Sequence, residues 1–320
     1  MDACVLQVRA VTAGRRRQST AGWDPQEWAA LAQLTQLTRL HIDVNVADSE
    51  GHDGFFDVLQ GLKDLRIVGA WVWDNSRYLP LIQGLAHLTH VCGAWSLAVG
   101  GLDVSSVKCP QVKELHETCG EIPFAAFPNL AGVSFYEVTE DHVMSLSCCC
   151  SALEWIEMPD QPNFTGDDAT RALAYRSLAT FKHLTHLEVP SCDAEDFAVF
   201  VSAAAAAGEA APKLHYLHVH GPVQVTELMQ LPQLVSVCGV RELSVVVDID
   251  SKVVFPPPLD DASALRAVGL WLVGLAVVPK VSLKGRLDEH RSLIEAAKLW
   301  ATQRGLPLPA SLRVSVAPDD

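Results

Sequence analysis

One short apolar pattern recurs along most of the chain, and it constrains the fold more strongly than any other feature of the sequence. In its clearest copy, Leu34, Leu37, Leu40 and Ile42 stand three, three and two residues apart, and Asn45 follows. Copies, some of them looser, begin at Leu34, Leu59, Leu85, Cys109, Phe127, Cys150, Phe181, Ala211, Val237 and Ala262, at intervals of 18 to 31 residues. A segment of this length cannot bury its own apolar face, so neighbouring copies must stack around a continuous core.

The end of each copy alternates apolar residues with others, which predicts a short strand whose apolar side chains point inward. We expect strands at residues 39–43, 64–68, 90–94, 114–118, 132–136, 155–159, 186–190, 216–220, 242–246 and 267–271, in one parallel sheet. Asp24 followed by Pro25 is typical of a helix start, and residues 167–178 and 193–207 also carry helical signals. The predicted fold class is therefore α/β, with a parallel sheet covered by outer helices.

Over residues 28–274 this pattern resembles the leucine-rich repeat family. The resemblance implies a horseshoe-shaped solenoid of about ten repeats, with a concave parallel sheet and helices on the outside. It indicates a fold and says little about activity. Gly93 and Glu117 replace apolar residues at the ends of two expected strands, and one interval is only 18 residues long. We therefore expect a bend or distortion between about residues 90 and 135.

The chain is expected to have three parts. Residues 1–22 form a basic N-terminal arm with several arginines, residues 23–278 the solenoid, and residues 279–320 a cap made of a helix over 287–303 and a strand. The arm has the composition of a transit peptide, but Asp2 and a poor apolar face make organelle import the less favoured interpretation. Arg15–Arg17 ahead of Ser19 match a kinase site, a match that short motifs often make by chance.

Composition excludes several classes of function. The charge is −14, from 24 basic and 38 acidic residues, which argues against direct binding of nucleic acid or of an anionic membrane. Only 19% of residues are charged and 49% are hydrophobic, so a large core is expected. The apolar run at 267–279 is shorter than the roughly 20 residues of a membrane span. Nine cysteines without a CxxC pair suggest buried thiols in a reducing, cytoplasmic compartment.

The predicted strands place a row of polar and aromatic residues on the concave face. Such side chains are typical of interface anchors, although an ordinary solvated sheet face would look similar in sequence. The candidate protein-binding residues are Arg39, His41, Arg66, His90, His116, Tyr136, Trp155, Glu157, Glu188, Tyr216, His218 and Trp271.

Neither a metal, a cofactor nor a catalytic residue is predicted. His218 and His220 share one face of a strand, next to His186 and Glu188, but strand alternation alone accounts for this spacing. No phosphate-binding loop, HExxH or GxSxG motif occurs. A Cys92–His116 pair on an open sheet would lack the closed pocket that a thiol nucleophile needs.

The favoured function is a non-enzymatic scaffold, adaptor or structural subunit that binds other proteins inside a large multi-subunit complex. Many alanines and an excess of arginine over lysine suggest a GC-rich genome such as that of a green alga. Proteins of this type there are common in the ciliary axoneme and in ribosome-associated complexes, so cytoplasm or cilium is the expected location. The alternative is the substrate-recognition subunit of a ubiquitin ligase, which would need an F-box-like helical module before the repeats.

Overall fold

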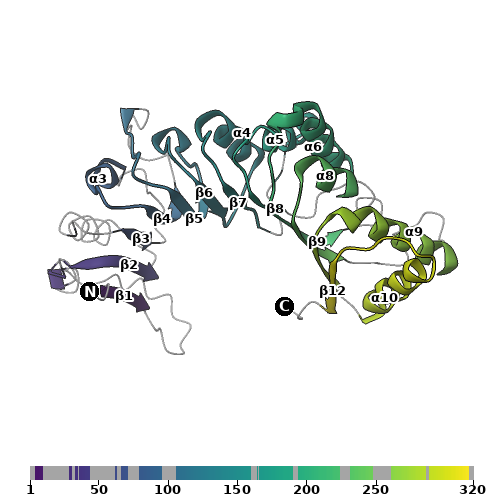
Figure 1. The fold of residues 1–320 in the computed structure, drawn as a ribbon. Coiled ribbons are helices and arrows are strands. Elements are labelled where there is room, and N and C mark those ends of the chain that lie inside the picture. The colour runs from purple at the N-terminus through teal and green to yellow at the C-terminus, as the bar shows by residue number, and fades with distance from the viewer. Residues whose placement is uncertain are drawn as a thin grey trace. The chain divides into compact units, whose positions relative to one another are not determined.

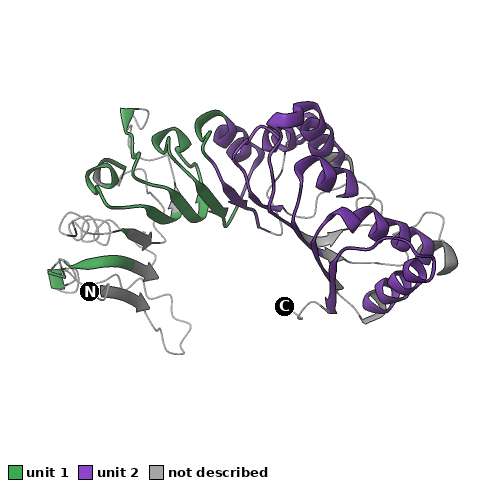
Figure 2. Cartoon of the chain, in the orientation of Figure 1, with its two compact units in different colours: residues 1–137, 148–152 green, residues 138–147, 153–320 purple. Residues whose placement is uncertain are grey.

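The computed structural model describes residues 4–9, 29–30, 33–34, 36–43, 62, 66–70, 79–95, 106–159, 164, 166–189, 194–223, 231–247, 261–285 and 288–316. The chain divides into two compact units (Figure 2). Unit 1 comprises residues 1–137 and 148–152, and unit 2 comprises residues 138–147 and 153–320. Both units belong to the α/β class, and every strand pair described in them is parallel.

Unit 1 is built on strands that pair in the order of the chain (Figure 1). They are β1 (Cys4–Arg9), β2 (Leu37–Asp43), β3 (Ile67–Ala70), β4 (His90–Trp95), β5 (Glu114–Gly120) and β6 (Gly132–Phe135). Short helical segments connect them, α3 (Leu79–Gly84) before β4 and η3 (Phe124–Ala126) before β6.

Unit 2 repeats the same order of elements with longer helices. Its strands are β7 (Trp155–Glu157), β8 (His186–Val189), β9 (Tyr216–Val223), β10 (Glu242–Val247), β11 (Lys280–Gly285) and β12 (Ser311–Val316). The helices of this part of the chain are α4 (Glu140–Cys149), α5 (Asp168–Leu178), α6 (Ala194–Ala207), α8 (Leu231–Cys238), α9 (Asp261–Gly274) and α10 (Asp288–Gln303), with η4 (Gly208–Ala210) and η5 (Leu275–Val277). In Figure 1 the helices of unit 2 lie along one side of its strands.

The apolar positions of the repeat form the core, as the alternation predicts. In unit 1 the strands place Leu40, Val91, Leu115 and Val133 inward, each no more than 3% exposed. In unit 2 the equivalent residues are Ile156, Leu187, Leu217, Leu243 and Val281, all fully buried. Burying one such side chain contributes about 1.5–3 kcal/mol. The predicted parallel sheet with alternating burial is therefore confirmed.

The three-residue spacing ahead of each strand has a backbone explanation. The N–H of Leu88 donates to the carbonyl of Leu85, and Leu184 bonds Phe181 in the same way, so the two apolar residues close a turn. Two consecutive N–H groups then donate to the carbonyl of the residue just before the preceding strand, as those of Thr185 and His186 do to Glu154. The turn and the start of the next strand therefore recur in the same geometry, because the apolar pair closes the same backbone turn in each copy.

The tenth predicted strand is wrong, because residues 267–271 lie inside helix α9. The strand of this region is β11, preceded by Leu275 and Val278, and it places Val281 and Leu283 inward; these four residues are fully buried. Apolar residues spaced by three also suit a helix, and the run from 261 to 274 is longer than the usual strand of 4–8 residues. Trp271, predicted on the sheet face, is consequently buried in α9 at 2% exposure.

The predicted register of the second strand is also wrong, by three residues. Val68, not Leu65, pairs with Leu40 and Val91, and Ile67 pairs with His90. Leu59, Leu62, Leu65 and Val68 are all spaced by three, so two registers fit the sequence equally well. Arg66 therefore precedes β3 and is exposed there, instead of projecting from the sheet face.

The ends of the chain differ from the expected three-part division. Part of the predicted arm, Cys4–Arg9, forms strand β1 and pairs with β2. The predicted helix and final strand of the C-terminal segment are present as α10 and β12. However, β11 pairs with β10 and β12 pairs with β11, both in unbroken parallel register, so the sheet continues past residue 278. No helix among the described residues has the length and apolar character needed to span a membrane.

Strand β5 carries the expected distortion in the form of one extra residue. Between matched pairs, β5 has two residues where β4 and β6 each have one, namely Glu117 and Thr118 against β4 and His116 and Glu117 against β6. This defines a bulge centred on Glu117. Glu117 adopts a positive φ of 48° and its N–H donates to Ser134 Oγ at 2.9 Å. The bulge leaves the Glu117 side chain exposed and turns Thr118 inward, because burying an unpaired carboxylate would cost far more than a hydroxyl.

Candidate functional site

The sheet face of unit 2 that points away from the core carries two cross-strand rows of side chains. Register places Trp155, His186, Tyr216, Glu242 and Lys280 in the first row. The second row contains Glu157, Glu188, His218 and Ser244. All five predicted residues of this region, Trp155, Glu157, Glu188, Tyr216 and His218, therefore lie together on one face.

Tyr216 is the centre of this face. Its ring lies 5.9 Å from that of His186 and meets His218 edge-on at 6.3 Å. The Tyr216 hydroxyl is 3.2 Å from His218 Nδ1. Burial, followed by the charges of Glu188 and Glu242, raises the pKa of the Tyr216 phenol above its ordinary value. The phenol is therefore a neutral hydrogen-bonding group at physiological pH, held among carboxylates.

Charge on this face is mainly negative. Glu157 and Glu188 are register partners on adjacent strands, and Glu242 forms an ion pair with Lys280. Like charges directly opposite each other on a sheet are unfavourable.

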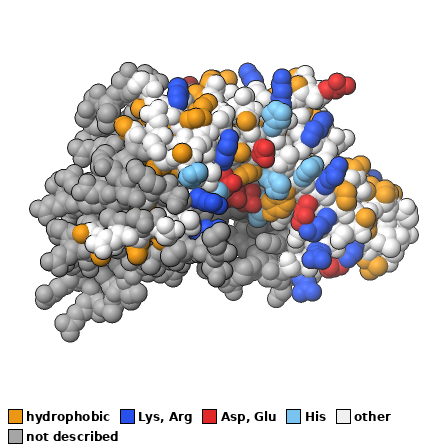
Figure 3. All heavy atoms as spheres, turned by 60° about the vertical axis from the view of Figure 1, so that its left-hand side comes forward, with side chains coloured by type: hydrophobic (Ala, Val, Ile, Leu, Met, Phe, Trp, Pro, Cys, Tyr) orange, Lys and Arg blue, Asp and Glu red, His pale blue; other side chains and the backbone are white. Residues whose placement is uncertain are grey.

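Apart from Trp271, which is buried in α9, the remaining predicted residues lie in unit 1. Arg39 is exposed on β2, His90 and His116 are half-buried on β4 and β5, and Tyr136 is 64% exposed just after β6. His41 lies in β2 opposite Gly69, and its side chain is outside the described residues. Figure 3 shows a face of the molecule on which histidine side chains lie beside acidic ones.

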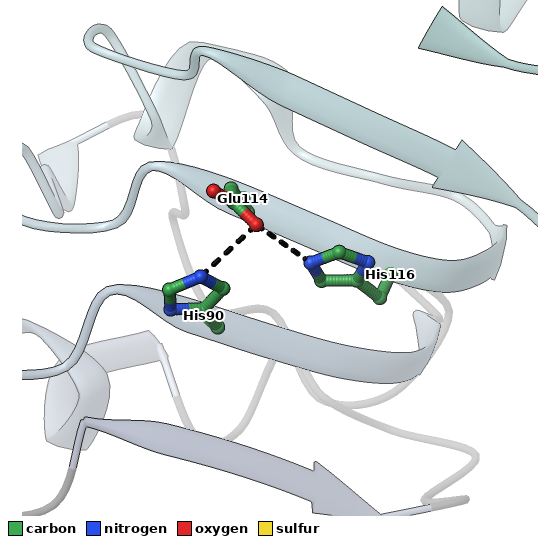
Figure 4. Close-up of side chains that lie close together, drawn as sticks. All are labelled: His90, Glu114 and His116. Carbon is green, nitrogen blue, oxygen red and sulfur yellow. Dashed lines mark hydrogen bonds and ion pairs between the residues drawn. The ribbon is translucent and has the colours of Figure 1, made fainter. Parts of the chain in front are cut away.

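The structure brings His90 and His116 together around Glu114 (Figure 4). Glu114 Oε2 is 3.0 Å from His90 Nε2 and 2.9 Å from His116 Nε2. The two imidazole rings are stacked, with centroids 5.8 Å apart and planes 12° apart. One nitrogen of each histidine and one carboxylate oxygen of Glu114 thus lie within 4.8 Å of one another, close enough to share a metal ion.

This cluster differs from the histidine group considered in the sequence. Among the described residues, His90, Glu114 and His116 are the set with metal-compatible spacing, whereas His186, Glu188 and His218 do not form one; the His220 side chain lies outside the described residues. The sequence offered a signal in the Glu-x-His of β5, since residues two apart share a face. Glu114 was not predicted as a metal-ligand candidate, because His90, which completes the cluster, comes from a separate copy of the repeat.

Several free thiols among the described residues are made less reactive by burial. Burial raises the pKa of Cys109 and Cys238 to about 11 and that of Cys150 to about 12. Cys92, opposite His116, has its pKa raised to about 11 by burial and then by the charges of Glu117 and Glu114. A thiol of this kind is protonated at neutral pH, so Cys92 is not an activated nucleophile.

A second surface lies among the helices of unit 2. Alanine side chains of α6 and residues at the end of α5 line an open groove of about 670 Å³, with Arg176 and Lys182 at its border. Small apolar side chains permit close helix packing.

Comparison with models of known protein families gives no match, and comparison with curated proteins gives none either.

Proposed function

We propose that this chain is a leucine-rich-repeat solenoid that binds another protein through the outward sheet face of unit 2. The observation that carries the proposal is the convergence of Trp155, Tyr216 and His218 with Glu157 and Glu188 in two adjacent rows. Aromatic residues are enriched among the anchors that supply most of the energy of protein interfaces. They act best when surrounded by polar groups that fix the orientation of the partner.

The partner is proposed to present basic residues. Glu157, Glu188 and Glu242 surround the aromatic centre, and the whole chain carries a charge of −14. Such a field accelerates association with a positive surface and makes it depend on salt. The role is that of an adaptor or structural subunit in a larger assembly. Ciliary and ribosome-associated complexes are the first assemblies to examine.

A comparison of partner recovery tests this proposal. A Trp155→Ala, Tyr216→Ala, His218→Ala variant is compared with wild type in quantitative affinity capture from the native cell, with rising salt. The variant is expected to lose the main partner, because truncating a single anchor costs at least about 1–2 kcal/mol of binding. Wild-type recovery is expected to fall as salt increases.

The matched control truncates Arg266 and Arg304, which are exposed on α9 and after α10, away from the sheet face. This control should recover the partner as wild type does. If the face variant keeps both its circular dichroism spectrum and its partner, while the helix-side control loses the partner, the sheet face is not the binding surface.

A further inference from the structure

We propose that His90, Glu114 and His116 form a zinc site on the sheet face of unit 1. The proposal goes beyond partner binding, since it concerns a different unit and a different ligand. Two imidazole nitrogens and one carboxylate oxygen are a donor set that zinc uses, with water or another group in the fourth position. Mg²⁺ and Ca²⁺ prefer oxygen ligands, so this set discriminates against them.

The two distances from the carboxylate to the imidazoles suit a small ion, and the two Nε2 atoms lie within 4.8 Å of each other. Zinc binds nitrogen and oxygen at about 2.0–2.2 Å, so neighbouring ligand atoms in a tetrahedral site stand about 3.3 Å apart. Here Glu114 Oε2 lies 3.0 Å and 2.9 Å from the two Nε2 atoms. Each contact needs to lengthen by only a few tenths of an ångström. The three side chains are about 30–33% exposed, so an ion can reach them from solvent.

Thr89 holds His90 in an orientation suited to metal binding. Thr89 Oγ1 is 2.7 Å from His90 Nδ1 and also 3.3 Å from the carbonyl oxygen of Arg66. The hydroxyl has one proton, so when it donates to the Arg66 carbonyl, Nδ1–H donates to Thr89 Oγ1. In the neutral ring Nε2 then has a free lone pair beside the Glu114 carboxylate, and a cation between them can bind both atoms. A second-shell group that accepts from the far ring nitrogen is typical of histidine metal ligands.

The bulge of β5 begins at the second histidine. The next residue, Glu117, is the extra residue of the bulge and has a positive φ of 48°. Bulges re-aim side chains and occur frequently beside functional sites. Here the Glu117 N–H bond to Ser134 Oγ fixes the backbone directly after His116. The backbone thus determines where His116 points before any ion binds.

Unit 2 contains a natural control for this site. Thr185 contacts His186 Nδ1 at 3.0 Å and the Glu154 carbonyl at 3.1 Å, as Thr89 contacts His90 and Arg66. However, the residue beside His186 on the next strand is Tyr216 rather than a glutamate. The threonine–histidine pair is therefore shared, but a glutamate paired with this histidine on the next strand is present only for His90.

The experiment measures binding of Zn²⁺ to the full chain after chelator treatment, by competition with a chromophoric chelator. Wild type is expected to bind Zn²⁺. His90→Ala, Glu114→Gln and His116→Ala should each weaken the Zn²⁺ affinity more than about 100-fold, since second-shell changes alone cost about 10–100-fold. Thr89→Val should weaken binding about 10-fold. His186→Ala should bind as wild type does. Co²⁺ in the site should show the visible bands of a tetrahedral complex.

Three results would overturn the proposal. The first is wild-type Zn²⁺ affinity in the Glu114→Gln, His116→Ala double variant. The second is equal loss in His186→Ala. The third is displacement of Zn²⁺ by millimolar Ca²⁺, which would indicate a nonspecific acidic surface. Circular dichroism of each variant must match wild type, and Glu114→Gln retains a hydrogen-bonding side chain of the same size, so loss of affinity in that variant reports the missing charge.

Discussion

Strands β4–β6 of unit 1 and strands β10–β12 of unit 2 are built from the same repeat but differ in regularity. In unit 2, six consecutive residues of β10 pair with β11, and β11 with β12, without any shift. In unit 1, the register shifts on both sides of β5. Leu115 and Leu243 occupy equivalent buried positions, but the next inward position is Thr118 in unit 1 and Val245 in unit 2.

The difference shows that a parallel repeat tolerates a polar residue at a core position if the backbone inserts one residue beside it. Glu117 is exposed and Thr118 buried, so the cost is one buried hydroxyl instead of one buried charge. The outward faces of the two units also carry different side chains. Strands β7–β9 of unit 2 present Trp155, Tyr216 and His218 in adjacent rows, whereas the bulged stretch of unit 1 gathers two imidazoles around one carboxylate.

The largest effect is expected from a charge in either core. Leu115→Asp and Leu243→Asp each place an unpaired carboxylate at a position that is fully buried. Each should lower the free energy of unfolding by about 3–5 kcal/mol or more. Denaturant titration measures the loss, and hydrogen exchange should show lost protection in the neighbouring strands as well.

The control for this pair is Leu173→Asp, because Leu173 is 47% exposed on α5. It should unfold within about 0.5 kcal/mol of wild type. Equal stability of all three variants would mean that the repeat register assigned to both units is incorrect.

The next effect tests the helices that cover the two units. A Cβ at Gly269 of α9 would lie 2.5 Å from the Trp300 ring on α10, so Gly269→Val should destabilise by about 1–3 kcal/mol. Gly84 of α3 has no atom within 4 Å of such a Cβ, so Gly84→Ala should stabilise by about 0.4–1 kcal/mol. Thermal melting measures both effects. A melting temperature that shifts in the same direction for both substitutions would contradict this packing.

A reciprocal exchange sharpens the comparison of the two core positions. The Thr118 hydroxyl is buried without a hydrogen-bond partner among the described residues. Thr118→Val should therefore stabilise by about 1 kcal/mol, and Val245→Thr should destabilise by about 1–3 kcal/mol. Urea unfolding of both variants checks the signs. Destabilisation by Thr118→Val would mean that the hydroxyl makes a hydrogen bond that stabilises the bulge.

Alkaline pH should act through the buried thiols, two in unit 1 and one in unit 2. Cys109, Cys150 and Cys238 have folded pKa values of about 11 to 12, against 9.0 for a free thiol. Above pH 9 the unfolded chain therefore holds fewer protons than the folded chain, and stability falls as pH rises towards 11. At pH 10 each thiol should account for about 1 kcal/mol.

The measurement is urea unfolding at pH 8 and pH 10 for wild type and for Cys150→Ala. The substitution removes a buried sulfur, so it lowers stability at both pH values. The variant should nevertheless lose less unfolding free energy between pH 8 and pH 10 than wild type does. An identical loss would show that Cys150 does not contribute to the pH dependence.

The smallest effect on stability is expected at the outward faces. Tyr136, in unit 1, is 64% exposed, so Tyr136→Ala should change the free energy of unfolding by no more than about 0.5 kcal/mol. It should also leave partner recovery intact, because it lies outside the proposed binding face. Loss of the partner in Tyr136→Ala, with Trp155→Ala unaffected, would move the binding surface from unit 2 to unit 1.

Local periodicity was sufficient to predict much of the fold from the sequence. The strands at β4, β5 and β8–β10 lie where alternation placed them, because side-chain direction in a strand depends only on whether residue separation is odd or even. Unit 2 likewise has Trp155, Tyr216 and His218 on one outward face, as predicted. Glycine and glutamate at Gly93 and Glu117 correctly indicated where the register would shift.

Only the tertiary structure decided between patterns that look alike locally. Apolar residues spaced by three fit a helix, the turn before a strand or a strand shifted by three residues equally well. The tertiary packing therefore decided the positions of α9 and β11 and the register of Val68. For the same reason the sequence alone did not show that Glu114 joins His90 and His116. Those three residues meet because cross-strand pairing brings together segments that are distant along the chain, and the free energy of that pairing resides in the stacked core and not in the segments themselves.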